Sequence, residues 1–155
     1  DTALRNLNKQ LQDISDDYDH IIMDLGAGIE KNVRYLAALA DRVVVVLTDE
    51  PTSLTDAYAF IKLCLQQDNT AQIQVVINQA STRKEGEKIY GAILKACQNF
   101  LNYEPELLGI IRKDNKVRDA IRTQSPMLKK SPASTAATDA AAIAVKLMQT
   151  QMQNA

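Results

Sequence analysis

The stretch RVVVVLTDEPTSLTDAYAFIKLCLQQ, residues 42–67, reads as a strand followed at once by a helix. Its first six residues, 42–47, contain four consecutive valines, a run typical of a parallel strand that is buried on both faces. Pro51 and the apolar spacing over 53–67 predict a helix, and Ser53 and Asp56 have the spacing of a capping box at its start. A strand joined directly to a helix is the unit from which parallel sheets are built.

The same alternation continues in both directions along the chain. Right-handed crossovers between parallel strands place helices on the two sides of the sheet. The sequence therefore predicts an α/β fold with three layers, in which helices cover both faces of a mostly parallel sheet of about four strands. One domain is expected to span residues 1–155. The predicted strands are 20–24, 42–47, 72–78 and 107–111, and the predicted helices are 3–15, 33–40, 53–67, 85–101, 115–124 and 134–153.

The composition is that of a globular protein. The chain has 155 residues, of which 46% are hydrophobic and 24% are charged, enough to bury a core and remain soluble. Cys64 and Cys97 are far apart and lack metal or redox spacing, so they are interpreted as reduced thiols of a cytoplasmic protein. No apolar run reaches membrane-spanning length. The chain starts with Asp1 within an amphipathic pattern, which suggests a piece of a longer protein.

Charge is distributed unevenly. Residues 1–60 contain eleven acidic and five basic residues, whereas residues 112–130 contain seven basic and two acidic residues. The second stretch is a candidate surface for an anion, with a solvated helix and loop as the alternative. The C-terminal segment 144–155 has a single basic residue, Lys146, and few apolar ones, so no membrane anchor is evident there.

Polar residues follow the predicted strands, and ligands of open parallel sheets lie beyond the carboxyl ends of the strands. Asp24 ends the run HIIMD and is followed by Gly26 and Gly28. A carboxylate can hold Mg²⁺ through water, and glycines allow backbone N–H groups to approach a phosphate. The alternative is a glycine-rich turn in which the aspartate caps a helix.

Asn78 ends a second predicted strand. Its amide offers a donor and an acceptor, which suits the edge of a nucleobase, although asparagine is also common in turns. The single histidine, His20, lies beside two isoleucines and is interpreted as structural. No zinc-ligand spacing, hydrolase motif or pair of carboxylates is present, and no glycine-rich loop carries a lysine. The 155 residues therefore offer nothing that would cradle β- and γ-phosphates.

Four segments in order resemble the MinD/ParA family of P-loop ATPases with a deviant Walker motif. YDHIIMDLGAGI (18–29) resembles the second switch motif of that family. VVVVLTDEPTSLTDAYAFIK (43–62) resembles most closely its flagellar-number regulators, called FlhG or FleN. VVINQASTRKEGEKIYGAI (75–93), then LLGIIRKDNKVRDAIRTQSPML (107–128) with SPAS after it, continue the similarity, which covers about residues 15 to 145.

The resemblance implies roles for individual residues. Asp24 matches the aspartate that binds Mg²⁺ through water, and Gly26 and Gly28 match positions beside the γ-phosphate. Asn78 matches the asparagine that contacts adenine. Asp114 is retained from the Pro-x-Asp sequence beside the base, in which Arg112 replaces the proline.

The family's phosphate loop, its signature lysine and its first switch all lie upstream of residue 1. The resemblance therefore implies ATP and Mg²⁺ as cofactors of the intact protein, but no catalytic residue in this chain and no nucleotide bound by it alone. In the family, the strand carrying that loop inserts between the strands that match 20–24 and 42–47. Without it, the sheet is expected to contract or to be repaired by a second chain, as in a swapped dimer.

Three functions stay open. The first is the C-terminal portion of a MinD-like ATPase that regulates flagellar number or placement through ATP-dependent dimerisation, with a regulatory protein as partner. The second is a nucleotide-free regulatory or interaction module. The third is a ParA-type partition ATPase with affinity for DNA, which the string EPTSLTDAY (50–58) disfavours. A cytoplasmic location is expected, with peripheral association with the inner membrane as a further expectation for the intact protein.

Overall fold

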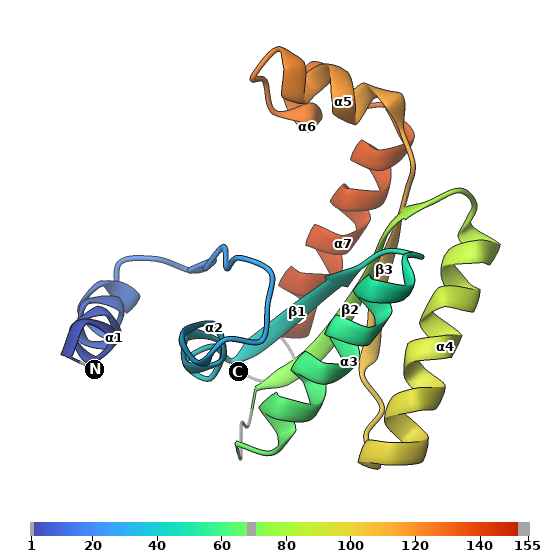
Figure 1. The fold of residues 1–155 in the computed structure, drawn as a ribbon. Coiled ribbons are helices and arrows are strands. Elements are labelled where there is room, and N and C mark those ends of the chain that lie inside the picture. Colours follow the sequence, from blue (N-terminus) through green and yellow to red (C-terminus); the bar gives the residue numbers. More distant parts are fainter. Residues whose placement is uncertain (1, 68–70, 152–155) are drawn as a thin grey trace.

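The computed structural model describes residues 2–67 and 71–151, which contain one parallel sheet (Figure 1). Its three strands stand in the order β1-β2-β3, with Val45 paired to Val75 and Val75 to Leu107. The predicted strands at 42–47, 72–78 and 107–111 and their parallel direction are confirmed. The strands are β1 (Arg42–Leu47), β2 (Gln72–Ala80) and β3 (Glu106–Arg112).

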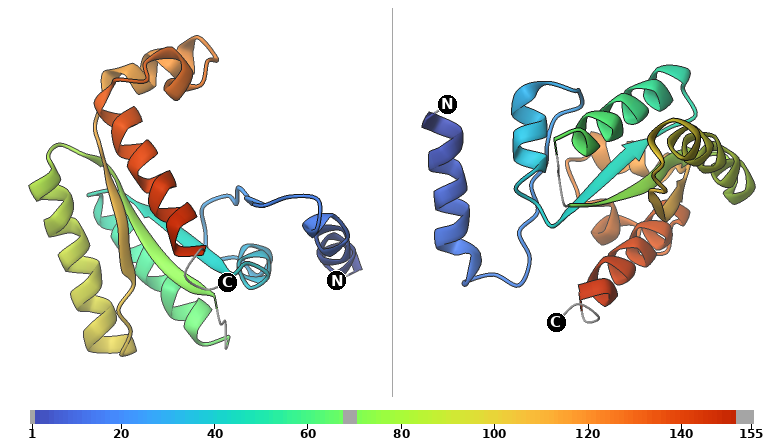
Figure 2. Two further views of the ribbon diagram at one scale, coloured as in Figure 1. Left: turned by 180° about the vertical axis from the view of Figure 1, so that it is seen from behind. Right: turned by 90° about the horizontal axis from the view of Figure 1, so that it is seen from below.

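Helices lie on both faces of the sheet, as predicted. α3 and α4 cover one face, and α7 crosses the opposite face along β3 (Figures 1 and 2). None of the described helices combines the length and apolar character needed to cross a bilayer. The final two residues of the predicted helix 134–153 lie outside the described part of the chain. The helices are α1 (Thr2–Ser15), α2 (Lys31–Ala37), α3 (Pro51–Leu65), α4 (Arg83–Leu101), α5 (Asn115–Arg122), α6 (Met127–Lys130) and α7 (Thr135–Gln151).

The main core lies between the sheet and the layer formed by α3 and α4. β2 is its centre, because Ile73, Val75 and Ile77 are almost fully buried between the two neighbouring strands and these helices. Both cysteines belong to this core, Cys64 on α3 and Cys97 on α4, and both are buried thiols. Burial raises the pKa of the Cys97 thiol, which keeps it protonated and unreactive near neutral pH.

The predicted strand at 20–24 is wrong. Residues 18–30 form no helix or strand, and the side chain of Ile22 is 90% exposed. A strand is stable only when its backbone groups pair with a neighbour. Within the described residues no strand lies beside β1 on its outer side, so the apolar run HIIMD has nothing to pair with. The sheet consequently has three strands in place of about four.

Burial of 42–47 on both faces is also wrong. Val43, Val45 and Leu47 are buried, whereas Val44 and Val46 are 39% and 57% exposed. Alternate side chains of a strand point to opposite faces, and on that second face α7 packs mainly along β3.

The predicted capping box at Ser53 is wrong as well. α3 begins earlier, with Pro51 in its first turn, and the Ser53 hydroxyl instead accepts a hydrogen bond from the Thr48 N–H at 3.0 Å. This bond ties the end of β1 to the start of α3, so the serine stabilises the turn between the two elements and not the end of the helix.

Two glycines of α4 predict opposite effects of the same substitution. A Cβ on Gly86 would lie 2.5 Å from Cγ2 of Ile110 on β3, so Gly86 allows α4 to approach the sheet closely. Gly91 faces open space. We expect Gly86→Ala to lower the free energy of unfolding by about 1–3 kcal/mol through overpacking. Gly91→Ala should raise it by about 0.5–1 kcal/mol through helix propensity. Urea denaturation would measure both, and equal effects would contradict the close packing of α4 on β3.

Candidate functional site

A pocket of about 280 Å³ lies at the carboxyl ends of β2 and β3, where α5 begins. Both Asn78 and Asp114 line it, so the fold brings together two of the residues singled out in the sequence. The pocket has apolar walls from Val117 and Ile121 of α5 beside these polar groups. The full set of lining residues is Asn78, Gln79, Ile111, Arg112, Lys113, Asp114, Asn115, Val117, Arg118 and Ile121.

Asn78 is placed in the pocket by an irregularity of β2. The pairing of β2 with β3 is shifted between Ile77 and Ala80, and Gln79 takes a positive φ of 59°, which is uncommon for a residue other than glycine. The Gln79 N–H donates to Oδ1 of Asn78 at 2.9 Å, which fixes the amide. Its NH₂ group and the second lone pair of the oxygen stay available to a ligand. The sequence analysis missed Gln79, because strand patterns do not reveal where a bulge occurs.

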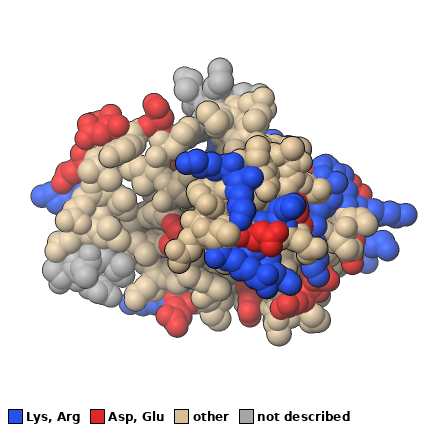
Figure 3. Space-filling model, turned by 90° about the horizontal axis from the view of Figure 1, so that it is seen from above, with Lys and Arg blue, Asp and Glu red and all other residues tan. Residues whose placement is uncertain are grey.

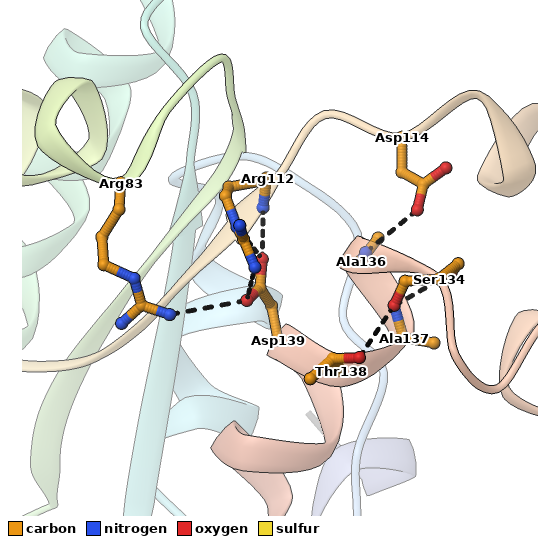
Figure 4. Close-up of polar contacts among 8 residues, drawn as sticks. All are labelled: Arg83, Arg112, Asp114, Ser134, Ala136, Ala137, Thr138 and Asp139. Atoms are coloured by element: carbon orange, nitrogen blue, oxygen red, sulfur yellow. Dashed lines mark hydrogen bonds and ion pairs between the residues drawn. The ribbon is translucent and has the colours of Figure 1, made fainter.

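Asp114 holds the loop between β3 and α5. It is the N-cap of α5, and its Oδ1 accepts the Lys116 N–H at 2.9 Å. Its Oδ2 accepts the Ala136 N–H of α7 at 3.1 Å (Figure 4). These backbone donors at Lys116 and Ala136 lower the pKa of the Asp114 carboxyl, so it is ionised at neutral pH. Both oxygens therefore have structural partners before any ligand arrives.

Arg112, at the position where the family has proline, is committed to Asp139 of α7. Its Nε and Nη2 donate to the two carboxylate oxygens of Asp139 at 2.9 and 2.8 Å, and its backbone N–H donates to Oδ2 at 3.0 Å. Arg83 lies 3.6 Å from the same carboxylate (Figure 4). These bonds from Arg112 lower the pKa of Asp139, although burial opposes them, and Asp139 raises the pKa of Arg112.

The Arg112–Asp139 pair fastens α7 to the end of β3 and fixes the backbone from which the Asp114 loop starts. Asp139 is only 4% exposed. The sequence analysis did not single it out, although one signal was available. Asp139 is the only acidic residue after Asp119, and it lies in an alanine-rich helix.

Asp24, Gly26 and Gly28 do not line this pocket. They lie in the irregular segment 18–30, and all three are exposed. Gly28 has a φ of +135°, a conformation that favours glycine, and an added Cβ at Gly26 or Gly28 would meet no atom within 4 Å. The backbone there is as open as a phosphate would require. The structure nevertheless does not bring it together with Asn78 and Asp114.

The described residues fit a nucleobase better than they fit a metal ion. The pocket combines apolar walls with the Asn78 amide, which matches a flat base that has polar edges. No group of three or more His, Cys, Asp or Glu side chains that could hold a metal occurs among residues 2–67 and 71–151. Asp24 therefore suits Mg²⁺ only as one contributor, with water and nucleotide phosphates supplying the other oxygen ligands.

Comparison with known proteins extends over almost the whole chain. Residues 2–148 match the family described as cellulose biosynthesis protein BcsQ. The antiactivator FleN of Pseudomonas aeruginosa is 34% identical over 141 residues, which is 91% of this chain and 50% of FleN. The flagellum site-determining protein YlxH of Helicobacter pylori is 30% identical over 115 residues, 74% of this chain and 38% of YlxH. The chain thus spans about half the length, or less, of these curated relatives.

Solved structures agree with these matches. The MinD cell division protein of Aquifex aeolicus superposes with a TM-score of 0.74 and 27% identity, over 94% of this chain and 61% of that protein. The cell division ATPase MinD of Pyrococcus furiosus, with a TM-score of 0.72 and 20% identity, supports the fold alone. The chain therefore belongs to the family described as cellulose biosynthesis protein BcsQ, within the MinD/ParA group of ATPases.

Proposed function

We propose that this chain is the base-binding portion of a MinD-like ATPase that regulates flagellar number or placement through ATP-dependent dimerisation. The observation that carries the proposal is the pocket between β2, β3 and α5, in which Asn78 and Asp114 meet. Similarity to FleN and YlxH supports the flagellar role over other roles in the group. Adenine would lie against Val117 and Ile121, and its polar edge would face the Asn78 amide.

The remaining parts of the site would come from outside the pocket. Asp24 would hold Mg²⁺ through water, and the exposed backbone at Gly26 and Gly28 would approach the γ-phosphate. When bound, Mg²⁺ would neutralise charge on the phosphates. The phosphate loop and its lysine would be supplied by sequence that precedes these 155 residues. With the site divided in this way, this chain would determine the specificity for the base and would not by itself catalyse hydrolysis.

Dimerisation is part of the proposal. The outer edge of β1 has no partner strand within the described residues, and Val44 and Val46 are exposed beside it. Unpaired edges of this kind recruit another strand. We infer that this chain pairs with a second copy across that edge when no other strand fills it. The solved complex of MinC with MinD from Aquifex aeolicus shows that a relative assembles with a protein partner.

Calorimetric titration tests the division of the site. Mg-ATP added to the 155-residue chain is expected to give no submicromolar binding and no hydrolysis, because its sequence has no glycine loop with a lysine. A chimera that places the upstream part of FleN before residue 1 should bind and hydrolyse ATP. In that chimera, Asp24→Ala should lower kcat about a hundredfold or more through the loss of Mg²⁺. Asn78→Ala should instead weaken binding of ATP about tenfold and leave the weaker binding of GTP unchanged.

The outcomes separate two failures. Submicromolar binding by the chain alone would mean that a phosphate loop is dispensable. A folded chimera in which Asn78→Ala changes ATP and GTP binding equally would mean that the pocket does not hold the base. Glu87→Ala, an exposed acidic position on α4, is the matched control for Asp24→Ala.

A further inference from the structure

α5, α6 and the turn between them, residues 115–130, form a basic hairpin that projects beyond the sheet (Figures 1 and 2). The molecular face that contains this hairpin shows a concentration of Lys and Arg side chains (Figure 3). Lys116, Arg118, Arg122 and Lys129 are exposed, and none has an ion-pair partner among the described residues. Their charge is therefore available to an anionic partner.

The hairpin also presents apolar side chains to solvent. Ile121 on α5 is 71% exposed and Leu128 on α6 is 51% exposed, each within one or two residues of a basic side chain. A partner made only of phosphates gains nothing from covering them. A protein segment that combines acidic and apolar side chains could cover both kinds of group, and such segments provide the anchor residues of protein interfaces.

A second hollow of about 280 Å³ lies between α5 and α6. Lys116, Arg122 and Lys130 surround it together with two hydroxyl residues, Thr123 and Ser131. The ammonium group of Lys130 donates to Oγ1 of Thr123 at 2.6 Å and to the Asp119 carbonyl at 3.2 Å, so it is held in place. The hollow has the donors that a single carboxylate requires.

The same hollow disfavours a nucleic acid. Asp119 also lines it, which lowers the net positive charge that the hairpin offers to a run of phosphates. A formal net charge of -1 for the whole chain gives little long-range attraction to a polyanion. An anionic membrane is disfavoured because the apolar side of α5 is largely committed to the fold. Ala120 is buried and Val117 lines the base pocket, which leaves Ile121 as the one exposed apolar side chain of this helix.

We propose that the basic hairpin is a docking surface for an acidic segment of a partner protein, with one acidic side chain in the hollow and an apolar side chain covering Leu128. Complementary charge would bring the segment to the hairpin, and the apolar contact would select it among acidic sequences. The surface does not depend on ATP, because the hollow and Leu128 lie outside the base pocket. Failure of the proposed nucleotide function would leave it unaffected.

Fluorescence anisotropy tests the surface with a labelled peptide that contains glutamate and leucine, with the leucines at the i, i+3, i+4 spacing of one helix face. A second peptide of the same charge has serine in place of each leucine. The 155-residue chain should bind the leucine peptide about tenfold more tightly than the serine peptide. Lys116→Glu with Arg122→Glu should weaken that binding about tenfold, and Leu128→Ser should remove most of the preference for leucine. Lys84→Glu with Lys95→Glu on α4 makes the same charge change elsewhere and should have little effect.

Duplex DNA and vesicles of anionic lipid are the competing probes. Equal affinity for the two peptides, with tighter binding of DNA that disappears as salt rises, would overturn the proposal in favour of a phosphate-binding surface. Tighter binding to vesicles, lost with Leu128→Ser, would overturn it in favour of a membrane surface. Absence of binding to either peptide would also overturn it. Circular dichroism of each variant shows that the fold is retained.

Discussion

Asp139→Ala is expected to lower the free energy of unfolding by about 3 kcal/mol, the largest effect of any single charged residue considered in this protein. The carboxylate accepts three hydrogen bonds from Arg112, two from its guanidinium and one from its backbone N–H. Removal of the carboxylate leaves these three donors without their acceptor. It also removes the hydrogen bonds that hold α7 to the end of β3. The lower end of the usual range is expected because the Arg112 side chain is 35% exposed and regains some water.

Chemical denaturation of Asp139→Ala beside Glu87→Ala measures this contribution, since Glu87 is an exposed acidic residue on α4. The Glu87 variant should change stability by less than about 0.5 kcal/mol. Arg112→Ala and the double variant Arg112→Ala with Asp139→Ala complete a thermodynamic cycle. The double variant should lose less free energy of unfolding than the sum of the losses in the two single variants. Additive effects, or an Asp139 variant as stable as the Glu87 variant, would contradict the role assigned to the pair.

The same pair makes stability depend on pH in a defined direction. The pKa of Asp139 is lower in the folded chain than the value of about 3.9 expected in the unfolded chain. The stabilisation is therefore fully present above that unfolded value and is lost as pH falls through the folded pKa. The stability difference between the natural chain and Asp139→Ala should narrow in acid and stay constant from about pH 6 to 8.

Val46→Lys is expected to weaken the pairing with a second copy that we propose for this chain. Val46 is 57% exposed on β1, whose outer edge has no partner strand in the described part of the chain. A lysine on an edge strand opposes pairing with another copy because two such charges would meet across the new sheet. We expect the dissociation constant of the dimer to rise about tenfold or more.

Sedimentation velocity over a range of concentrations measures this change. Phe100→Lys is the matched control, because Phe100 is 77% exposed on α4, away from the sheet edge. The control should leave association unchanged if β1 carries it. A natural chain that is monomeric at every concentration, or equal effects of the two lysines, would rule out pairing through β1.

The sequence alone determined the three strands of the sheet, their order along the chain and the edge at which the candidate site lies. Runs such as RVVVVL and QIQVVIN predict strands because β-branched residues fit a pleated, buried surface. This preference depends on the residues of the run itself, so it can be recognised in the sequence. Alternation with helices then required a parallel sheet, and Asn78 and Asp114 could be placed at its carboxyl edge from their positions in the chain. The resemblance to the MinD/ParA group followed from the same local segments.

Tertiary structure alone decided which of those segments find partners. HIIMD has the composition of a strand, yet pairing depends on a neighbour that no local pattern specifies, so residues 20–24 form no strand. The hydrogen-bond partners of Arg112 and Lys130 could not be read from local sequence either. Asp139, the partner of Arg112, is 27 residues away, and Thr123, the partner of Lys130, lies across the turn between α5 and α6. Hydrophobic periodicity records which face of an element is buried, but it does not record what covers that face. For that reason three features could be found only in the folded structure. They are the bulge at Gln79, the buried carboxylate of Asp139 and the hollow of the basic hairpin.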